Sequence, residues 1–170
     1  MTGKTHLVGG LAASAIYLMA TRNGDFGAPD LNMVQSVISV PLVAAGSLLP
    51  DIDLRTSTVG QKAPALAWVV NTFLGHRTFF HSPLFLLILF MTVKTNIPFL
   101  LWIIIPVVVG AYSHLTLDML NRSGIPLLWP IQTRFWLLGV KTGGVEEKLF
   151  CQVLLVLTAA LWGRLLFQLL

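Results

Sequence analysis

An apolar stretch of 22 residues, from Ile97 to Asp118, constrains the fold more than any other part of the sequence. As a helix it would extend about 33 Å, which is close to the thickness of a bilayer core. Its last turns carry His114 and Asp118, which are four residues apart and therefore share one face of a helix. An imidazole and a carboxylate at this spacing can bind one metal ion, and ionisable groups at membrane depth usually serve a function. We expect the rest of the chain to bring further ligands to this helix end.

The composition is typical of an integral membrane protein. The chain has 170 residues, of which 55% are hydrophobic and 11% charged, whereas a soluble domain of this size carries about 25% charged residues. We therefore expect an all-α, membrane-embedded helical bundle that forms a single domain over residues 1–170. The lysines and arginines are dispersed, which indicates topology signals and no nucleic-acid partner. Cys151 is the only cysteine, so no disulfide can form within the chain, and it is expected in the packed core.

About five segments are expected to span the membrane. They are His6 to Ala20, Met33 to Leu49, Pro83 to Val93, Ile97 to Asp118 and Leu149 to Leu170. The first could instead be a cleaved signal peptide, although an uncleaved helix is favoured because the rest of the chain is itself apolar. Ala63 to Leu74 is too short to span and is expected to form an interfacial or re-entrant helix. Asn23 to Asn32 is expected to be a loop, Lys94 to Asn96 a tight turn and Asn121 to Lys148 a long connection.

Alternating helix directions bring the polar residues to one face of the membrane. That face receives all four histidines and three aspartates, namely His6, His76, His81, His114, Asp51, Asp53 and Asp118. It also receives eight of the eleven basic residues, namely Lys4, Arg55, Lys62, Arg77, Arg122, Arg134, Lys141 and Lys148. This bias places the polar face in the cytoplasm. If Ala63 to Leu74 did span the membrane, the polar set would be split between two faces.

The gathered residue types predict a divalent metal site. The expected ligands are His6, Asp51, His81, His114 and Asp118. Mixed imidazole and carboxylate ligation favours zinc, with manganese or iron as second choices, in a site of one or two ions. Such ions activate water and stabilise phosphoryl oxygens. Asp53 would then be a further ligand or orient the metal-bound water, and Arg77 would bind an anionic group of the substrate.

Structural roles remain open for several of these residues. A membrane histidine is often only packed or hydrogen-bonded, and His76 is the weakest ligand candidate. Asp51 or Asp53 could cap the turn that follows Pro50. Ser82 precedes Pro83 and is expected to be a helix N-cap, and Trp129 is expected to be an interfacial anchor. A serine nucleophile is not expected, because no Gly-x-Ser-x-Gly motif is present.

Several motifs in order along the chain resemble a known family. They are His6 with Gly9, Leu48-Leu49-Pro50-Asp51-Ile52-Asp53, His76-Arg77-x-x-x-His81-Ser82, His114-x-x-x-Asp118 and Leu128-Trp129-Pro130. Together they resemble the YdjM-like family of bacterial inner-membrane proteins, which are described as predicted, LexA-regulated, metal-dependent hydrolases. The resemblance covers nearly the whole chain. It implies a multi-pass inner-membrane hydrolase with a link to the SOS response.

A more distant similarity concerns zinc-dependent phospholipase C and its related single-strand nucleases. That superfamily cleaves phosphoesters at clustered zinc ions, and its ligand order is similar to His6, Asp51, His81 and His114-x-x-x-Asp118. Its later His and His-x-x-x-Glu have no counterpart here, because no histidine follows His114. The resemblance therefore implies one or two ions rather than three.

These observations predict a membrane-bound, metal-dependent hydrolase of the phosphatase or phospholipase type. Its substrate would be a phosphoester in a lipid or another amphiphile, at the cytoplasmic face of the inner membrane. The alternatives are a cation-binding transporter and a non-catalytic stress-response membrane protein that acts by protein contacts. Polar residues at one end of the helices argue against a transporter, whose site would lie at mid-depth. The sequence leaves the substrate and the oligomeric state open.

Overall fold

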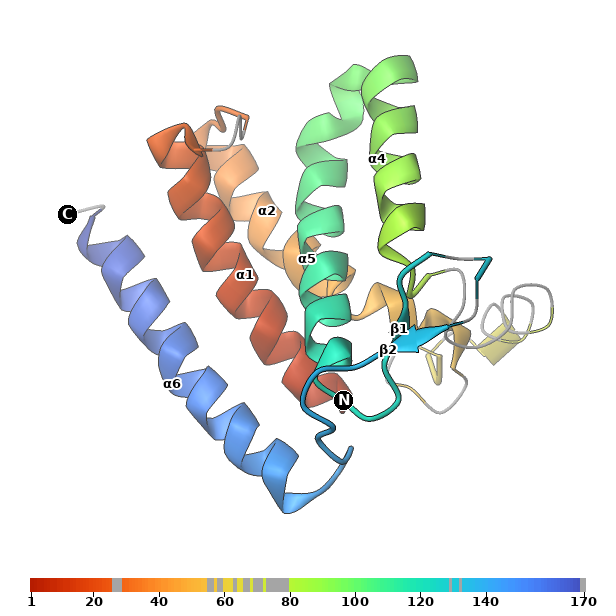
Figure 1. The fold of residues 1–170 in the computed structure, drawn as a ribbon. Coiled ribbons are helices and arrows are strands. Elements are labelled where there is room, and N and C mark those ends of the chain that lie inside the picture. Colours follow the sequence, from red (N-terminus) through yellow and green to blue (C-terminus); the bar gives the residue numbers. More distant parts are fainter. Residues whose placement is uncertain are drawn as a thin grey trace.

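The computed structural model is a mostly helical bundle with its helices side by side (Figure 1). It describes residues 1–25, 29–54, 57, 60–62, 64–65, 68, 72, 80–128, 130–131 and 133–168, and only the backbone of residue 53. Several predictions lie outside this part of the chain. They concern most of the Ala63 to Leu74 segment, His76, Arg77, Trp129 and the side chain of Asp53.

Two of the described helices are long and apolar enough to cross a membrane. The helices are α1 (Gly3–Asn23), α2 (Met33–Gly46), α4 (Pro83–Asn96), α5 (Leu101–Met119) and α6 (Val145–Phe167), with 3-10 turns η2 (Leu49–Asp53) and η3 (Pro98–Leu100). The candidate spans are Pro98–Met119, which joins η3 to α5, and Val145–Phe167. The helices α2 and α4 are apolar but shorter, with 14 residues each.

The predicted boundaries differ from the observed ones for physical reasons. Helix α2 ends at Gly46, before the predicted Leu49, because Pro50 has no N–H to donate to the Gly46 carbonyl. Helix α4 continues through Lys94 to Asn96, so the predicted tight turn is its last turn. Helix α6 starts at Val145, and its first turn carries two glutamates that suit the positive helix N-terminus.

Two local predictions need correction. The connection from Asn121 to Lys148 contains a short antiparallel pair of strands, β1 (Ile125–Pro126) and β2 (Arg134–Phe135), so the chain is not strictly all-α. Ser82 occupies the N-cap position of α4, but its side chain makes no capping hydrogen bond. Its hydroxyl instead donates to the carbonyl of Leu127 at 3.3 Å, which ties the start of α4 to this connection.

Helices α2 and α5 pack with their backbones in close contact. A Cβ at Gly46 would collide with the backbone of Val107, and a Cβ at Gly110 would collide with the backbone of Val43. Small residues at helix contacts allow such an approach, as in other membrane proteins. The contact fixes the end of α2, and with it η2, beside the last turns of α5.

Several other helices also begin at this end of the bundle. The start of α1, the start of α4 and the start of α6 lie near the end of α5 (Figure 1). A small apolar core of Leu86, Ala111, Leu115 and Ile125 joins α4, α5 and β1 there. Helix α6 packs mainly against α1, and its Cys151 is only half-buried, in contrast to the predicted core position.

We predict that Gly110→Ala destabilises the protein, because the added methyl group has no space between α5 and α2. Overpacking of this kind costs about 1–3 kcal/mol in the free energy of unfolding. Thermal unfolding of the detergent-solubilised protein, followed by circular dichroism, measures this loss. Gly163→Ala is the matched control, since no atom outside its own turn of helix lies within 4 Å of the point where the new methyl carbon would stand. Equal melting temperatures for the two variants would contradict the close helix contact.

Candidate metal centre

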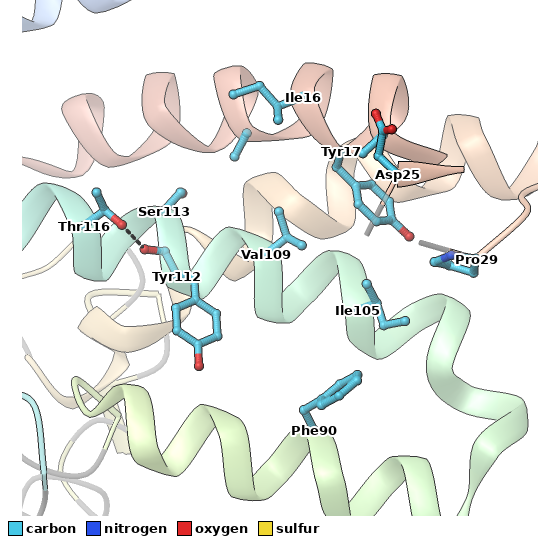
Figure 2. A pocket seen from close by; sticks show the side chains of 12 residues that line it. Ile16, Tyr17, Asp25, Pro29, Phe90, Ile105, Val109, Tyr112, Ser113 and Thr116 are labelled. Carbon is cyan, nitrogen blue, oxygen red and sulfur yellow. Dashed lines mark hydrogen bonds between the residues drawn. The ribbon is translucent and has the colours of Figure 1, made fainter. Parts of the chain in front are cut away.

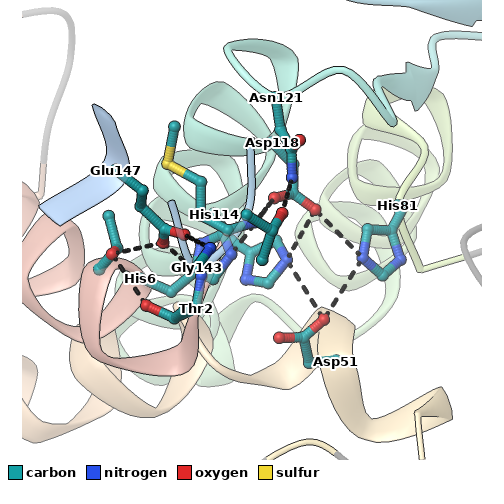
Figure 3. Close-up of polar contacts among 12 residues, drawn as sticks. Thr2, His6, Asp51, His81, His114, Asp118, Asn121, Gly143 and Glu147 are labelled. Carbon is teal, nitrogen blue, oxygen red and sulfur yellow. Dashed lines mark hydrogen bonds and ion pairs between the residues drawn. The ribbon is translucent and has the colours of Figure 1, made fainter. Parts of the chain in front are cut away.

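Five predicted ligands meet at the end of the bundle where α1, η2, α4 and α5 approach one another (Figure 3). They are His6 in α1, Asp51 in η2, His81 just before α4, and His114 and Asp118 on one face of α5. The side chains of His6, His81, His114 and Asp118 are fully buried, and that of Asp51 is 13% exposed.

Four of these side chains form a compact set of two nitrogens and two oxygens. Nε2 of His81 lies 3.8 Å from Asp51 Oδ1 and 3.9 Å from Asp118 Oδ2. Nε2 of His114 lies 3.8 Å from Asp51 Oδ1 and 3.6 Å from Asp118 Oδ2. Both nitrogens therefore face both carboxylates, from opposite corners of one small space (Figure 3).

These separations suit a shared ion better than hydrogen bonds. A nitrogen-to-oxygen hydrogen bond has a length of about 2.7–3.2 Å, and all four distances exceed that range. Two ligand atoms that each lie about 2.1 Å from one tetrahedral zinc ion are about 3.4 Å apart. The four distances are a few tenths of an ångström wider than that. His81, His114 and Asp118 form a group whose ligand atoms all lie within 4.8 Å of one another, and Asp51 faces both histidines of that group.

A backbone carbonyl orients His114 toward this set. Nδ1 of His114 lies 2.8 Å from the carbonyl oxygen of Ser47, which can only accept a hydrogen bond. Nδ1 must therefore carry a proton, and Nε2 is the ring nitrogen that faces the carboxylates and could bind a metal through its lone pair. Histidine ligands of metals are commonly held in this way by a partner on the other nitrogen. Nε2 is buried and has no hydrogen-bond partner among the described residues, so a metal ion would satisfy it.

His6 lies on the other side of His114. The two imidazole rings stack with their centroids 3.6 Å apart, and Nε2 of His6 is 3.3 Å from Asp118 Oδ1. The amino nitrogen of Met1 is 2.5 Å from the same oxygen. Oδ1 of Asp118 thus contacts the start of α1, while its Oδ2 faces His81 and His114. His6 also forms a second possible ligand group with Asp51 and His114, whose ligand atoms all lie within 4.8 Å of one another.

Asp51 is the ligand candidate on the solvent side. Burial raises the pKa of its carboxyl group, but the neighbouring imidazoles of His81, His114 and His6 lower it more. The net effect holds the pKa of Asp51 below its ordinary value. The side chain is therefore a carboxylate at neutral pH, which is the form that binds metals.

A buried glutamate braces the cluster from α6. Glu147 accepts hydrogen bonds from the backbone N–H of Thr2 at 2.5 Å, the hydroxyl of Thr5 at 2.7 Å and the backbone N–H of Gly143 at 2.6 Å. These bonds fix the start of α1, and therefore His6, against the start of α6 (Figure 3). Beside them, the side-chain amide of Asn121 donates to Thr142 Oγ1 at 2.5 Å.

Sequence reasoning missed these supporting residues. Glu147 is not among the predicted site residues, and in the structure its carboxylate joins the start of α6 to the start of α1. The sequence offers one indication of a role for Glu147: it is one of only seven acidic residues in an apolar chain, and it lies just before the last apolar segment. The Ser47 carbonyl has no sequence signal, because every residue has one. Asp53 and Arg77 keep their predicted roles as predictions, since neither side chain is described.

Comparison with known proteins gives a clear family match. A family model described as YdjM inner membrane protein matches residues 1–169. The uncharacterized protein YvsG of Bacillus subtilis (strain 168) is 42% identical over 153 residues, which cover 88% of this chain and 86% of YvsG. The inner membrane protein YdjM of Escherichia coli (strain K12) is 36% identical over 123 residues, which cover 69% of this chain and 63% of that protein. No solved structure matches the chain.

The family match agrees with the helices described above. The matched family consists of inner membrane proteins, and two helices of this chain are long and apolar enough for membrane insertion. The matched range includes all five residues of the cluster. The chain therefore belongs to the YdjM inner membrane protein family.

Proposed function

We propose that this protein is a membrane-embedded, metal-dependent hydrolase of phosphoesters in lipids or other amphiphiles. The observation that supports the proposal is the set of four distances of 3.6–3.9 Å between two imidazole nitrogens and two carboxylate oxygens. Burying several ionisable groups at one place is costly, so their convergence favours a bound cation.

The proposed site holds one divalent ion, with zinc favoured over manganese or iron. The two possible ligand groups share His114, whose Nδ1 is already bound to Ser47. A single nitrogen, Nε2, can bind only one ion, so both groups cannot be filled through His114 at once. His81, His114, Asp51 and Asp118 would hold the ion, and His6 would approach it as a further ligand.

The chemistry of this proposal follows from the exposure of Asp51. Asp51 is the partly exposed member of the set, so water and substrate would approach the ion from its side. Such an ion can lower the pKa of a bound water and polarise a phosphoryl oxygen. In this proposal Asp53 orients the attacking water and Arg77 binds the anionic group of the substrate.

We further propose that α1, α2, α4, α5 and α6 all span the membrane, with η2 and the metal centre at the cytoplasmic face. Support comes from the shared end of the bundle at which α1, α4 and α6 begin and α5 ends. Eight of the eleven lysines and arginines are predicted at that end of the bundle, and the positive-inside rule associates such an excess with the cytoplasmic face. A site at the end of the helices fits an enzyme that works on lipid headgroups better than it fits a transporter.

Metal analysis tests the proposed centre. Wild-type protein purified in detergent should contain about one zinc, manganese or iron ion per chain, measured by inductively coupled plasma mass spectrometry. His114→Ala and Asp118→Asn should each lose most of the ion, because each removes a ligand. Asp30→Asn is the control, since this carboxylate is exposed and far from the cluster in sequence. Circular dichroism verifies that each variant is folded, and a wild type without metal would contradict the proposal.

Hydrolysis of phosphoesters should depend on the same ion. We expect purified protein in mixed micelles to release phosphate or a phosphorylated headgroup from at least one member of a lipid phosphoester panel. A chelator should abolish the release, and added zinc should restore it. Asp118→Asn should lower the rate by at least about a hundredfold, whereas Asp30→Asn should leave it unchanged. A chelator-insensitive rate, or equal rates in wild type and Asp118→Asn, would exclude metal-dependent catalysis.

Cysteine labelling tests the topology. In a Cys151→Ser background, Thr95→Cys places a thiol at the end of α4 far from the cluster, and Lys141→Cys places one at the cluster end. An impermeant maleimide applied to intact cells with a permeabilised outer membrane should label Thr95→Cys and not Lys141→Cys. Disruption of the inner membrane should make both accessible. The reverse pattern would place the metal centre on the periplasmic side.

A further inference from the structure

A groove between α1, α4 and α5 is separate from the metal centre. It has a volume of about 470 Å³, and its lining is mostly apolar, with Ile16, Phe90, Ile105 and Val109 among the residues that form it. On α5 the groove follows Val109, Ser113 and Thr116, whereas His114 and Asp118 point to the cluster (Figures 2 and 3). Cavities that bind small ligands usually have volumes of about 300–1,000 Å³.

One polar group in the groove has no partner among the described residues. The hydroxyl of Tyr17 is buried, with the residue only 5% exposed, and it makes no hydrogen bond within the described part of the chain. Figure 2 shows its ring reaching from α1 toward Pro29, at the end of the groove opposite Thr116. A buried hydroxyl without a partner costs free energy, so an acceptor supplied by a ligand would stabilise this arrangement.

Tyr17 lies near the end of α1 that is remote from the metal centre. Tyr17 follows His6 by eleven positions on α1, which corresponds to about 16 Å along the helix axis. Six residues, or about 9 Å of helix axis, separate Tyr17 from Asn23, the last residue of α1, so Tyr17 lies closer to this end of the helix than to His6. Asp25 and Pro29 line the groove at this end, and the Asp25 carboxylate is exposed. A carboxylate at the mouth attracts a cationic group and repels an anionic one.

We propose that this groove binds a diacyl phospholipid with an ammonium headgroup. One acyl chain lies along the apolar lining between α1 and α5. An ester carbonyl of the lipid accepts a hydrogen bond from the Tyr17 hydroxyl, and the ammonium group lies near Asp25. This site is structural and distinct from the metal centre, so it does not depend on the proposed hydrolase activity.

Native mass spectrometry of the detergent-solubilised full chain tests the hydrogen bond. The probes are phosphatidylethanolamines with identical chains and headgroup, joined by either ester or ether linkages. Wild type should bind the ester lipid about fivefold more tightly than the ether lipid, because only the ester has a carbonyl acceptor. Tyr17→Phe should bind both lipids equally. An ester preference that persists in Tyr17→Phe, or its absence in wild type, would overturn the proposal.

Tyr112→Phe is the matched control, because the chain has two tyrosines and both line the groove. The Tyr112 hydroxyl already donates to the carbonyl of Pro83 at 3.2 Å, so its loss should leave the ester preference intact. Asp25→Asn should remove the preference for phosphatidylethanolamine over phosphatidylglycerol. Ala13→Leu fills the groove and should displace the lipid. Lipid retained equally by Ala13→Leu, with unchanged thermal unfolding, would place the lipid elsewhere and refute the assignment.

Discussion

The backbone contact between α2 and α5 is the interaction on which the candidate metal centre depends. Gly46 and Gly110 remove the side chains that would keep the two helices apart. The Ser47 carbonyl, one residue after Gly46, is then within 2.8 Å of His114 Nδ1. The same contact carries η2 to the end of α5, where Asp51 faces His114. Two glycines at the helix contact thereby determine which ring nitrogen of His114 faces the carboxylates, one turn of helix after Gly110.

The polar cluster carries a large free-energy cost of burial for a small apolar protein. Four of its side chains are fully buried, and burial penalises charged and polar groups. Apolar residues of similar size would pack at this place with less loss of free energy. The polar set is therefore not explained by stability, and the ion proposed above would account for its separations. The apolar core of Leu86, Ala111, Leu115 and Ile125 packs at the same end of the bundle.

The sequence predicts the position of the cluster better than its internal support. The alternating directions of successive helices predict that His6, Asp51 and His114 lie at one end of the bundle. This prediction needs only the order of the apolar segments along the chain. The predicted end of α2 is wrong because Pro50 acts on the carbonyl of Gly46 as well as on its immediate neighbour. The contact of the Ser47 carbonyl with His114 and the groove at Tyr17 arise where helices distant in sequence pack together. Residue spacing along the chain does not predict how such helices pack. The family match confirms the resemblance, whereas the roles of Asp53 and Arg77 stay predictions.

The buried Nε2 of His114 has a consequence for the lifetime of the protein. An ion that binds only the folded chain stabilises it by about 2.7 kcal/mol when its free concentration is a hundred times its dissociation constant. A chain that has not acquired its ion lacks this contribution and unfolds more often, which exposes it to membrane proteases. The cellular abundance of the protein would then follow metal supply, even when its synthesis is constant.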